Sequence, residues 1–295
     1  VLFRKSVEIK NVPESAEVEI SADTRYKFYV NGQLIEVGPS KGDKSIWFKD
    51  RLDICKHLKT GKNILAVQVL RYPENPMDGN HGMFRTATPG LYLKGYIQNQ
   101  NGERLSLDAD ESWKYYIDRS RSFVWEEERF APLIIHENAY GNEETRGWKN
   151  ADFDDTSWEN AKPYINVEIH QAVSPGNLHD RTIPYMYRKD RLFDSVMAVE
   201  KSAYTKEKWQ DFLDGKTVLT IPKDTEEILE ISVGEEMTGY ISLGLSAGKN
   251  AEITLIYAES YVQDEHVGPD HAALKKDRLD QVNGHLEGYQ DHYRA

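Results

Sequence analysis

The sequence predicts an all-β protein of two tandem antiparallel β-sandwich domains with jelly-roll-like topology. Short segments in which apolar and polar residues alternate recur along the chain, which is typical of strands with one buried face. Turns rich in glycine, asparagine and proline separate these segments, as expected for a sandwich. With 295 residues and 39% hydrophobic content, the chain can fill two cores of ordinary size. We expect the domains at residues 1–190 and 191–295, with the second domain cut short at its C-terminal end.

The hairpin at residues 22–39 is the clearest element of the first domain. Asn31-Gly32 favours a two-residue type I′ turn, because both central residues need a positive φ that asparagine and glycine adopt readily. Gly38-Pro39 ends the second strand, since proline cannot donate a hydrogen bond to the ladder. The two-residue loop predicts three cross-strand pairs, which are Val30 with Gln33, Phe28 with Ile35, and Tyr26 with Val37.

The rest of the first domain is expected to form further strands with short connections. Residues 16–22 alternate between apolar and polar side chains, and residues 90–97 resume the strand pattern. Residues 64–70 are apolar on both faces, which is typical of a central strand in a sandwich. Residues 50–58 predict a short helical turn, and residues 73–82 predict a long loop. The helical turn is expected to bury three side chains, Leu52, Cys55 and Leu58.

A linker and a second set of strands follow. Residues 181–186 have no periodic pattern, and Ile183 precedes a proline, which favours extended backbone. We therefore place the domain boundary near Arg191. Glycine turns at Gly234 and Gly248 separate the strands of the second domain. These strands are expected at residues 228–233, 239–246 and 251–259.

Composition narrows the classes of partner. The chain has 37 Lys and Arg against 49 Asp and Glu, and the net charge of -12 repels nucleic-acid phosphates and anionic lipid headgroups. No apolar run approaches the roughly 20 residues needed to span a bilayer. We therefore expect neither nucleic acid nor a membrane as a partner. A neutral carbohydrate meets no such repulsion, and 6 Trp with 17 Tyr offer rings on which sugars can stack.

Several loop and core motifs of the first domain form a set. They are Ala22-Asp23 followed by Tyr26, Val30-Asn31-Gly32, Gly38-Pro39, Gly61-Lys62-Asn63, Asp110-Glu111-Ser112-Trp113, Gly147-Trp148 and Phe153-Asp154-Asp155-Thr156-Ser157-Trp158. This set resembles the galactose-binding-like sandwich at the front of many glycoside hydrolases. Such motifs indicate a fold and do not identify the sugar that a protein of this fold would bind. In this fold we expect Trp113, Trp148 and Trp158 to be core residues.

The second domain adds a more specific resemblance. Its motifs are Met237-Thr238-Gly239-Tyr240, Ala247-Gly248 and Ile256-Tyr257-Ala258-Glu259. Together with the linker at residues 181–186, they resemble the concanavalin-like domain region of bacterial α-L-rhamnosidases. The resemblance implies the non-catalytic front of a secreted or periplasmic enzyme that hydrolyses terminal α-L-rhamnose by inversion. It also implies two partners, a rhamnose-containing glycan and a downstream catalytic α/α toroid of the same protein.

Two other classes of function stay open. A free-standing carbohydrate-binding or adhesion protein would have the sandwiches without a catalytic domain. Alternatively, a sandwich cleft could itself hydrolyse sugar, which needs two carboxylates roughly 6.5–9.5 Å apart for inversion or about 5 Å apart for retention. The candidates Glu126-Glu127-Glu128 and Glu235-Glu236 are consecutive and point to opposite faces, and Glu259 is expected to be a hydrogen-bond partner. No position matches the catalytic motifs of the resembled family, so we assign no catalytic residue and expect this segment alone to be inactive.

Some members of the resembled family bind rhamnose with calcium through a sandwich segment just before a Gly-Trp pair. The corresponding stretch is residues 139–146, which precede Gly147-Trp148. Glu144 stands at the position of a family Glu, whereas the family's Asp and Arg are not matched. The resemblance gives four candidate sugar-binding residues, which are Trp125, Tyr140, Asn142 and Glu144.

We expect no cofactor, and calcium is the one metal ion that the sequence leaves as an alternative. Asp152, Asp154 and Asp155 offer hard oxygen ligands, but this spacing also suits caps of the turn before Trp158. We favour the caps. The nearest histidine cluster lacks the spacing of paired metal ligands and consists of His266, Asp270 and His271.

Overall fold

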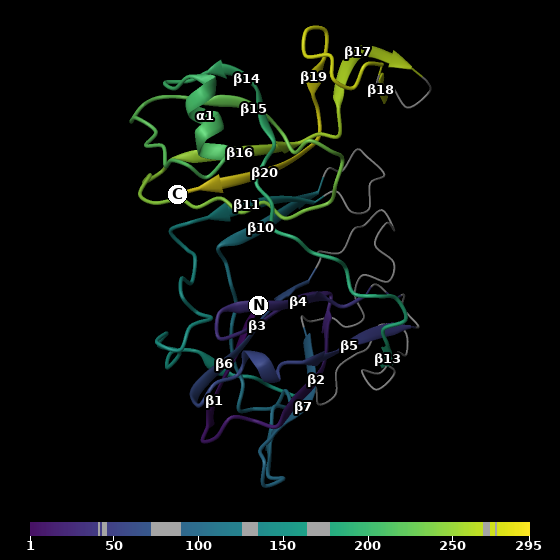
Figure 1. The fold of residues 1–295 in the computed structure, drawn as a ribbon, viewed down its shortest axis with the longest axis vertical. Helices are drawn as coiled ribbons and strands as arrows, with labels where there is room; N and C mark the ends of the chain where they lie inside the picture. Colours follow the sequence, from purple (N-terminus) through teal and green to yellow (C-terminus); the bar gives the residue numbers. More distant parts are fainter. Residues whose placement is uncertain are drawn as a thin grey trace. The chain divides into compact units, whose positions relative to one another are not determined.

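The computed structural model describes residues 1–40, 42, 46–71, 90–125, 135–163, 178–267, 272–274 and 276–295. Strands dominate this part of the chain, and only one α-helix and one 3-10 turn accompany them (Figure 1). The predicted all-β fold class is therefore confirmed. The described chain forms two compact units, one of Val1–Pro184 with Ala247–Ala295 and the other of Tyr185–Ser246.

Two sheets of the larger unit face each other as a sandwich. The first sheet has the strand order β12 (Glu159–Asn160), β9 (Lys114–Tyr116), β1 (Leu2–Ile9), β6 (Gly61–Leu70), β3 (Arg25–Val30) and β4 (Gln33–Gly38). The second has the order β13 (Leu178–Asp180), β5 (Trp47–Asp53), β2 (Ser15–Asp23), β7 (Gly90–Gln98) and β8 (Arg104–Ser106). One apolar cluster takes buried side chains from both sheets, so each sheet covers the inner face of the other.

Alternation along the strands builds this core. The inward-facing residues of β2 and β3 are Ala16, Val18, Ile20, Ala22, Tyr26, Phe28 and Val30, and all are buried. Strand β6 lies between β1 and β3 and is buried without interruption over residues 63–67, which confirms the central strand expected at residues 64–70. Trp113 belongs to the same core, as predicted. Fully burying a valine, leucine, isoleucine or phenylalanine side chain in such a core contributes about 1.5–3 kcal/mol.

The hairpin of β3 and β4 has the predicted turn. Asn31 and Gly32 have φ values of 51° and 83°, and Val30 pairs with Gln33. The Asn31 side chain also ties the turn to β6, because its Oδ1 accepts from the Ile64 amide at 3.0 Å. Asn31 therefore both adopts the positive φ that the turn needs and binds the neighbouring strand β6.

The register beyond the turn differs from the prediction. The pairs predicted for Phe28 with Ile35 and for Tyr26 with Val37 are wrong. After a bulge at Ile35, the observed pairs are Phe28 with Glu36 and Tyr26 with Gly38. A Cβ at position 38 would lie 2.8 Å from Cζ of Tyr26 and 2.2 Å from Oδ2 of Asp50, so the bulge brings a glycine where no side chain fits.

The connection after β5 is shorter than the predicted helical turn at residues 50–58. Strand β5 continues to Asp53, and a 3-10 turn then spans Cys55–His57. Leu52, Cys55 and Leu58 are partly buried at the edge of the core, whereas Ile54 is fully buried within it. Strand β7 confirms the strand expected at residues 90–97, and the loop expected at residues 73–82 lies outside the described residues.

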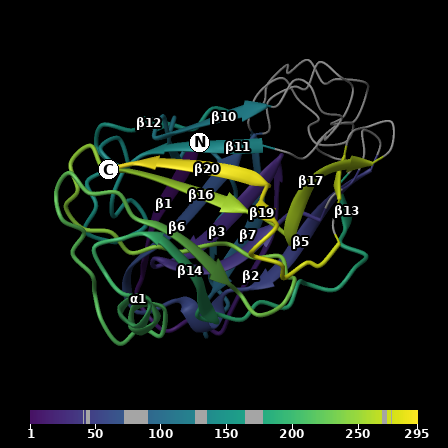
Figure 2. The same ribbon diagram turned by 90° about the horizontal axis from the view of Figure 1, so that it is seen from above.

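The C-terminal residues add strands to the larger unit. A four-stranded sheet has the order β10 (Arg121–Trp125), β11 (Ile135–Tyr140), β20 (Tyr289–Arg294) and β16 (Glu252–Tyr257), and both views show these strands side by side (Figures 1 and 2). A three-stranded sheet has the order β18 (Ala272–Leu274), β17 (Tyr261–Val267) and β19 (His285–Leu286). Because β20 is hydrogen-bonded to β11 on one side and β16 on the other, residues 247–295 group with residues 1–184. This division differs from the predicted domains at 1–190 and 191–295, which stay a prediction.

The smaller unit consists of a two-stranded sheet and one helix. β14 (Ser195–Lys201) pairs antiparallel with β15 (Ile228–Ser232), and β15 matches the strand expected at residues 228–233. The strand expected at residues 239–246 is not formed, because none of the described strands pairs with this segment. Apolar and polar residues do alternate in this segment, but a strand also needs a hydrogen-bonded neighbour.

Helix α1 (Lys206–Leu213) was not expected from the sequence, although its signals are present. The Thr205 side chain accepts from the Lys208 amide at 3.4 Å and so caps the helix. Trp209 and Leu213 are four residues apart and bury one face of the helix against Val196. Among the described residues, no helix has the length and apolar character required to cross a membrane.

Replacing Phe28 with alanine should lower the free energy of unfolding by about 3–5 kcal/mol, because the ring is fully buried between the sheets. Urea unfolding followed by circular dichroism measures this loss. Leu105→Ala on β8 is the control, since Leu105 is 42% exposed and its truncation should change stability by less than about 0.5 kcal/mol. Equal losses in the two variants would contradict the assignment of this core.

Candidate functional site

The segment predicted to bind sugar follows directly after β11. The Tyr140 amide donates to the Ser120 carbonyl at 2.8 Å, and the Gly141 amide donates to the Arg294 carbonyl at 2.7 Å. A Cβ at position 141 would lie 2.0 Å from the Tyr293 hydroxyl, so a larger residue there would require the Tyr293 side chain to move. The start of the segment is therefore fixed by backbone contacts on both sides.

The four candidate residues do not all come together. Asn142 is exposed, Tyr140 is half-buried, and the Glu144 carboxylate lies 3.4 Å from Nη2 of Arg121. Trp125 is the last residue of β10 and pairs with Ile135, whereas Arg121 at the other end of β10 pairs with Ala139 next to Tyr140. The backbone of Trp125 is therefore at the far end of the strand from Tyr140, and its side chain lies outside the described part of the structure.

Sequence reasoning missed the charged residues that Glu144 meets. Arg121 forms ion pairs with both Glu137 and Glu144, and all three side chains are about one-third exposed. The Glu137 amide donates to Oδ1 of Asp291 at 2.9 Å, and the Tyr257 hydroxyl donates to Oδ2 of the same carboxylate at 2.9 Å. Burial is the main cause of the raised pKa of the Tyr257 hydroxyl, and the hydrogen bond to Asp291 adds to it. No local pattern signals this group, since Asp291 and Glu137 meet only through the pairing of β11 with β20.

The electrostatic influence of Arg121 reaches β3. Burial lowers the pKa of the Lys27 ammonium, and the charge of Arg121 lowers it further. Burial also lowers the pKa of the Lys149 ammonium, which lies 4.4 Å from the centre of the Tyr29 ring. Arg121, which binds the Glu144 carboxylate, therefore also influences the charge of Lys27 on β3.

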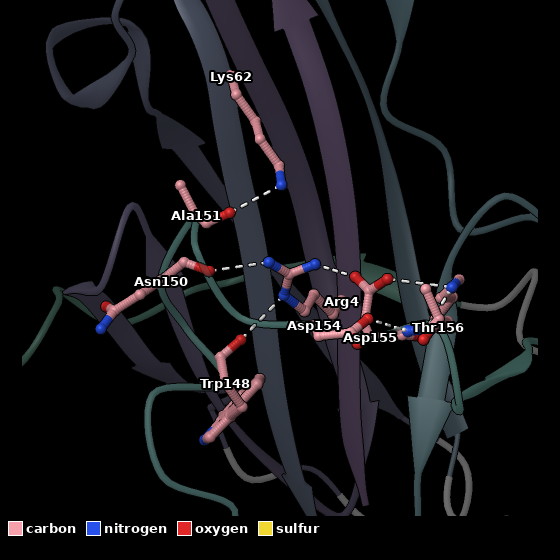
Figure 3. A network of polar contacts seen from close by, with 9 residues as sticks. Arg4, Lys62, Trp148, Asn150, Ala151, Asp154, Asp155 and Thr156 are labelled. Carbon is pink, nitrogen blue, oxygen red and sulfur yellow. Dashed lines mark hydrogen bonds and ion pairs between the residues drawn. The ribbon is translucent and has the colours of Figure 1, made fainter.

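Arg4 of β1 fixes the next part of the segment (Figure 3). Its side chain is 1% exposed, its Nε donates to the Trp148 carbonyl at 3.0 Å, and its Nη2 donates to the Asn150 carbonyl at 2.8 Å. Its Nη1 binds the Asp155 carboxylate, which also accepts from Nζ of Lys114 at 3.0 Å. A buried guanidinium is costly unless its donors are satisfied, so this network determines the path of the backbone.

Aromatic side chains cover the same outer face of the six-stranded sheet. Trp148 and Trp158 are buried, which confirms the prediction that they are core residues. Their cluster contains four buried residues of the sheet, which are Leu2, Tyr29, Ile64 and Ala66. The six-stranded sheet is therefore covered on both faces, by the second sheet and by residues 148–158.

The aspartates considered for calcium have separate roles. Oδ1 of Asp154 accepts from the Thr156 amide at 3.0 Å, which confirms the predicted turn cap for this residue (Figure 3). Asp155 instead binds Arg4 and Lys114, and Asp152 is exposed. Within the described ranges, no three His, Cys, Asp or Glu side chains come together in a way that could hold a metal ion. The side chains of His266, Asp270 and His271 lie outside those ranges.

Two of the carboxylates considered for hydrolysis, Glu235 and Glu259, lie in the described part of the chain with a basic side chain nearby. Glu126-Glu127-Glu128 lies outside the described residues, and Glu235 is exposed and paired with Arg191. Glu259 is exposed in the loop after β16, with its carboxylate 4.0 Å from Nη2 of Arg278. The described surroundings of Glu235 and Glu259 assign neither of them a catalytic role.

The first residue of the predicted linker is held inside the sandwich. Nε of Arg181 donates to Oδ1 of Asp50 at 2.8 Å, and the Tyr26 hydroxyl donates to the other oxygen of this carboxylate. Asp50 is fully buried, and burial raises its pKa, while Tyr26 and Arg181 oppose that shift. The chain therefore leaves the sandwich from a fixed point.

These features define a class of protein, a β-sandwich module in which several ion pairs, such as those of Arg4, Arg121 and Arg181, hold segments of the module in place. Residues 11–179 match the family described as Alpha-L-rhamnosidase N-terminal domain. The chain belongs to this family.

Individual relatives agree with this assignment. The chain is 23% identical over 201 residues to an α-L-rhamnosidase of Formosa agariphila, covering 60% of this chain and 19% of the relative. Its fold is similar to that of an α-L-rhamnosidase from Aspergillus terreus, with a TM-score of 0.57, 18% identity and coverage of 99% of this chain and 29% of the other. The α-L-rhamnosidase of Streptomyces avermitilis, solved with L-rhamnose, gives a TM-score of 0.56 at 15% identity, covering 100% of this chain and 24% of that one. The chain thus spans less than a third of the length of each of these proteins.

Replacing Arg4 with methionine should lower the free energy of unfolding by about 3–5 kcal/mol, because it leaves the Asp155 carboxylate and two carbonyls without their buried donor. Urea unfolding followed by tryptophan fluorescence suits this test, since Trp148 and Trp158 lie beside the network. Lys62→Met is the matched control. Its ammonium makes one exposed hydrogen bond to the Ala151 carbonyl at 2.7 Å, and its loss should cost about 1 kcal/mol or less. A loss for Arg4→Met no larger than for Lys62→Met would show that the network does not fix the segment.

Proposed function

We propose that this chain is the accessory, non-catalytic front part of an α-L-rhamnosidase that removes terminal α-L-rhamnose from glycans or glycosides. The catalytic domain belongs to the remainder of the parent protein. The observation that carries the proposal is the family match over residues 11–179 in a chain that spans 19% of its Formosa agariphila relative. The engagement of Asp155, Glu137 and Glu144 by basic side chains supports a structural role for these carboxylates.

Activity measurements on two proteins test this proposal. The 295-residue chain should not hydrolyse p-nitrophenyl α-L-rhamnopyranoside, whereas the full-length product of its gene should. Activity of the isolated chain would favour hydrolysis within a sandwich cleft. An open reading frame that ends with this chain, or a full-length product without rhamnosidase activity, would refute the proposal and favour a free-standing carbohydrate-binding protein.

We further propose that Tyr140, Asn142 and Glu144 contact a rhamnose-containing glycan. Asn142 is exposed, Glu144 is partly exposed, and their backbone is anchored at Tyr140 and Gly141. An anchored segment loses little conformational entropy when it binds a ligand. The relative from Streptomyces avermitilis that was solved with L-rhamnose supports this choice of sugar.

Calorimetric titration with L-rhamnose, with and without calcium, measures this binding. We expect a millimolar or tighter Kd, weakened at least about tenfold by Asn142→Ala or Glu144→Ala, a loss of about 1.4 kcal/mol. Glu143→Ala is the matched control, because Glu143 is exposed in the same segment and should leave the Kd unchanged. No heat under either condition would leave the segment with a structural role, and a dependence on calcium would place a metal at the sugar.

A further inference from the structure

A lysine without a counter-ion follows the residues proposed to contact the glycan. Lys149 comes directly after Trp148, and its Nζ lies 4.4 Å from the centre of the Tyr29 ring. Its side chain is partly buried, and burial lowers the pKa of its ammonium. Among the residues that the structure describes, no acidic side chain forms an ion pair with this ammonium. A partly buried cation that lacks a counter-ion is unfavourable, so this position favours an anion from outside the chain.

A second ammonium lies on the same face of the six-stranded sheet. Lys27 and Tyr29 are two residues apart on β3, and the residues that alternate with them face the core, so both side chains are on the outer face. Burial is the main cause of the lowered pKa of the Lys27 ammonium, and the charges of Arg121 and Lys149 lower it further. The Glu137 carboxylate opposes this shift, but it is already paired with Arg121. The ammonium groups of Lys27 and Lys149 are therefore close enough to repel each other.

Arg121 connects these lysines with the proposed glycan contacts. It forms ion pairs with Glu137 and Glu144, and Glu144 is one of the residues proposed to contact the glycan. Burial raises the pKa of the Tyr29 hydroxyl, and the charge of Arg121 opposes that rise. The two carboxylates offset the guanidinium, whereas Lys149 has no such ion pair among the described residues. An anion beside the Tyr29 ring would therefore meet a net positive charge next to the glycan contacts.

We propose that Lys149 and Lys27 bind an anionic group of the glycan, a carboxylate or a sulfate ester carried by a sugar that neighbours the rhamnose. This inference rests on the proposed function, which supplies the glycan, and it names the chemical class of that glycan. The chain carries a net charge of -12 and repels anions at long range, so an acidic glycan requires a local group of cations. Hydrogen bonds from ammonium groups to an anion are stronger than those between neutral groups, so two lysines suit this ligand.

Calorimetric titration of the chain with three sugars tests the site. D-glucuronate offers a carboxylate, D-glucose 6-sulfate offers a sulfate ester, and D-glucose offers neither. At least one anionic sugar should bind with a millimolar Kd, and the one that binds more tightly identifies the group. Raising NaCl from about 0.05 M to about 0.5 M should weaken this binding at least about threefold, because salt screens the cations.

Two results of these titrations would overturn the proposal. The first is that neither anionic sugar binds, or that D-glucose binds as tightly as they do. The second is that inorganic sulfate binds more tightly than both anionic sugars, which would assign the lysines to a free ion.

Substitutions show whether the charge of Lys149 is responsible. Lys149→Met keeps an unbranched side chain at this position and should weaken binding of the anionic sugar at least about tenfold, whereas Lys149→Arg should keep the Kd within about threefold. Lys162→Met is the matched control, because Lys162 is 77% exposed in the same unit and should leave the Kd unchanged. The thermal midpoint of Lys149→Met should not fall, since the substitution removes a cation without a counter-ion. Unchanged binding by Lys149→Met would overturn the proposal.

This inference and the proposed function fail in different ways. If the full-length product of the gene lacks rhamnosidase activity but the chain binds an anionic sugar through Lys149, the proposed function is wrong and the anion site stands. If the full-length product is active but the chain binds neither anionic sugar, the function stands and this inference is wrong.

Discussion

The burial of Arg4 on the outer face of the six-stranded sheet is the constraint on which much of the larger unit depends. An arginine that points away from the core of a sandwich normally reaches water. Here residues 148–158 cover it, and its guanidinium is satisfied by two backbone carbonyls and the Asp155 carboxylate. Because such a group is costly to bury without these partners, the loop has little freedom to move away. Trp148 and Trp158 complete the cover and bury the second face of the sheet.

This locked loop determines how the candidate binding segment is presented. Residues 142–146 are a short connection between two fixed points, the end of β11 and Trp148. One end is held by hydrogen bonds from Tyr140 and Gly141, and the other by Arg4. Arg121 adds a contact in the middle through Glu144. A segment held in this way is prepared to meet a ligand without a large ordering cost, although its own ion pair competes for the carboxylate.

The distribution of charge fits an accessory module. Acidic residues exceed basic ones in the chain, yet three carboxylates of the larger unit, those of Asp155, Glu137 and Asp50, are engaged by arginine. Such pairs hold neighbouring segments together. The ion pair of Arg181 with Asp50 fixes the first residue of the linker on the sandwich. The Asp291 carboxylate accepts a hydrogen bond from the Glu137 amide where β11 pairs with β20. Removing one partner of a buried ion pair greatly lowers the free energy of unfolding, so these contacts favour a rigid module.

Local rules in the sequence determined five strands of the sandwich, which are β2, β3, β4, β6 and β7, and the Asn31-Gly32 turn. They succeeded because strand periodicity and turn geometry depend on residues a few positions apart. The motifs also pointed to the family. The tertiary structure alone decided the bulge at Ile35, which the close approach of Gly38 to Tyr26 and Asp50 requires. It also decided which carboxylate meets Arg4 or Arg121 and that β20 pairs with β11, since these contacts join residues far apart in the chain and leave no local pattern.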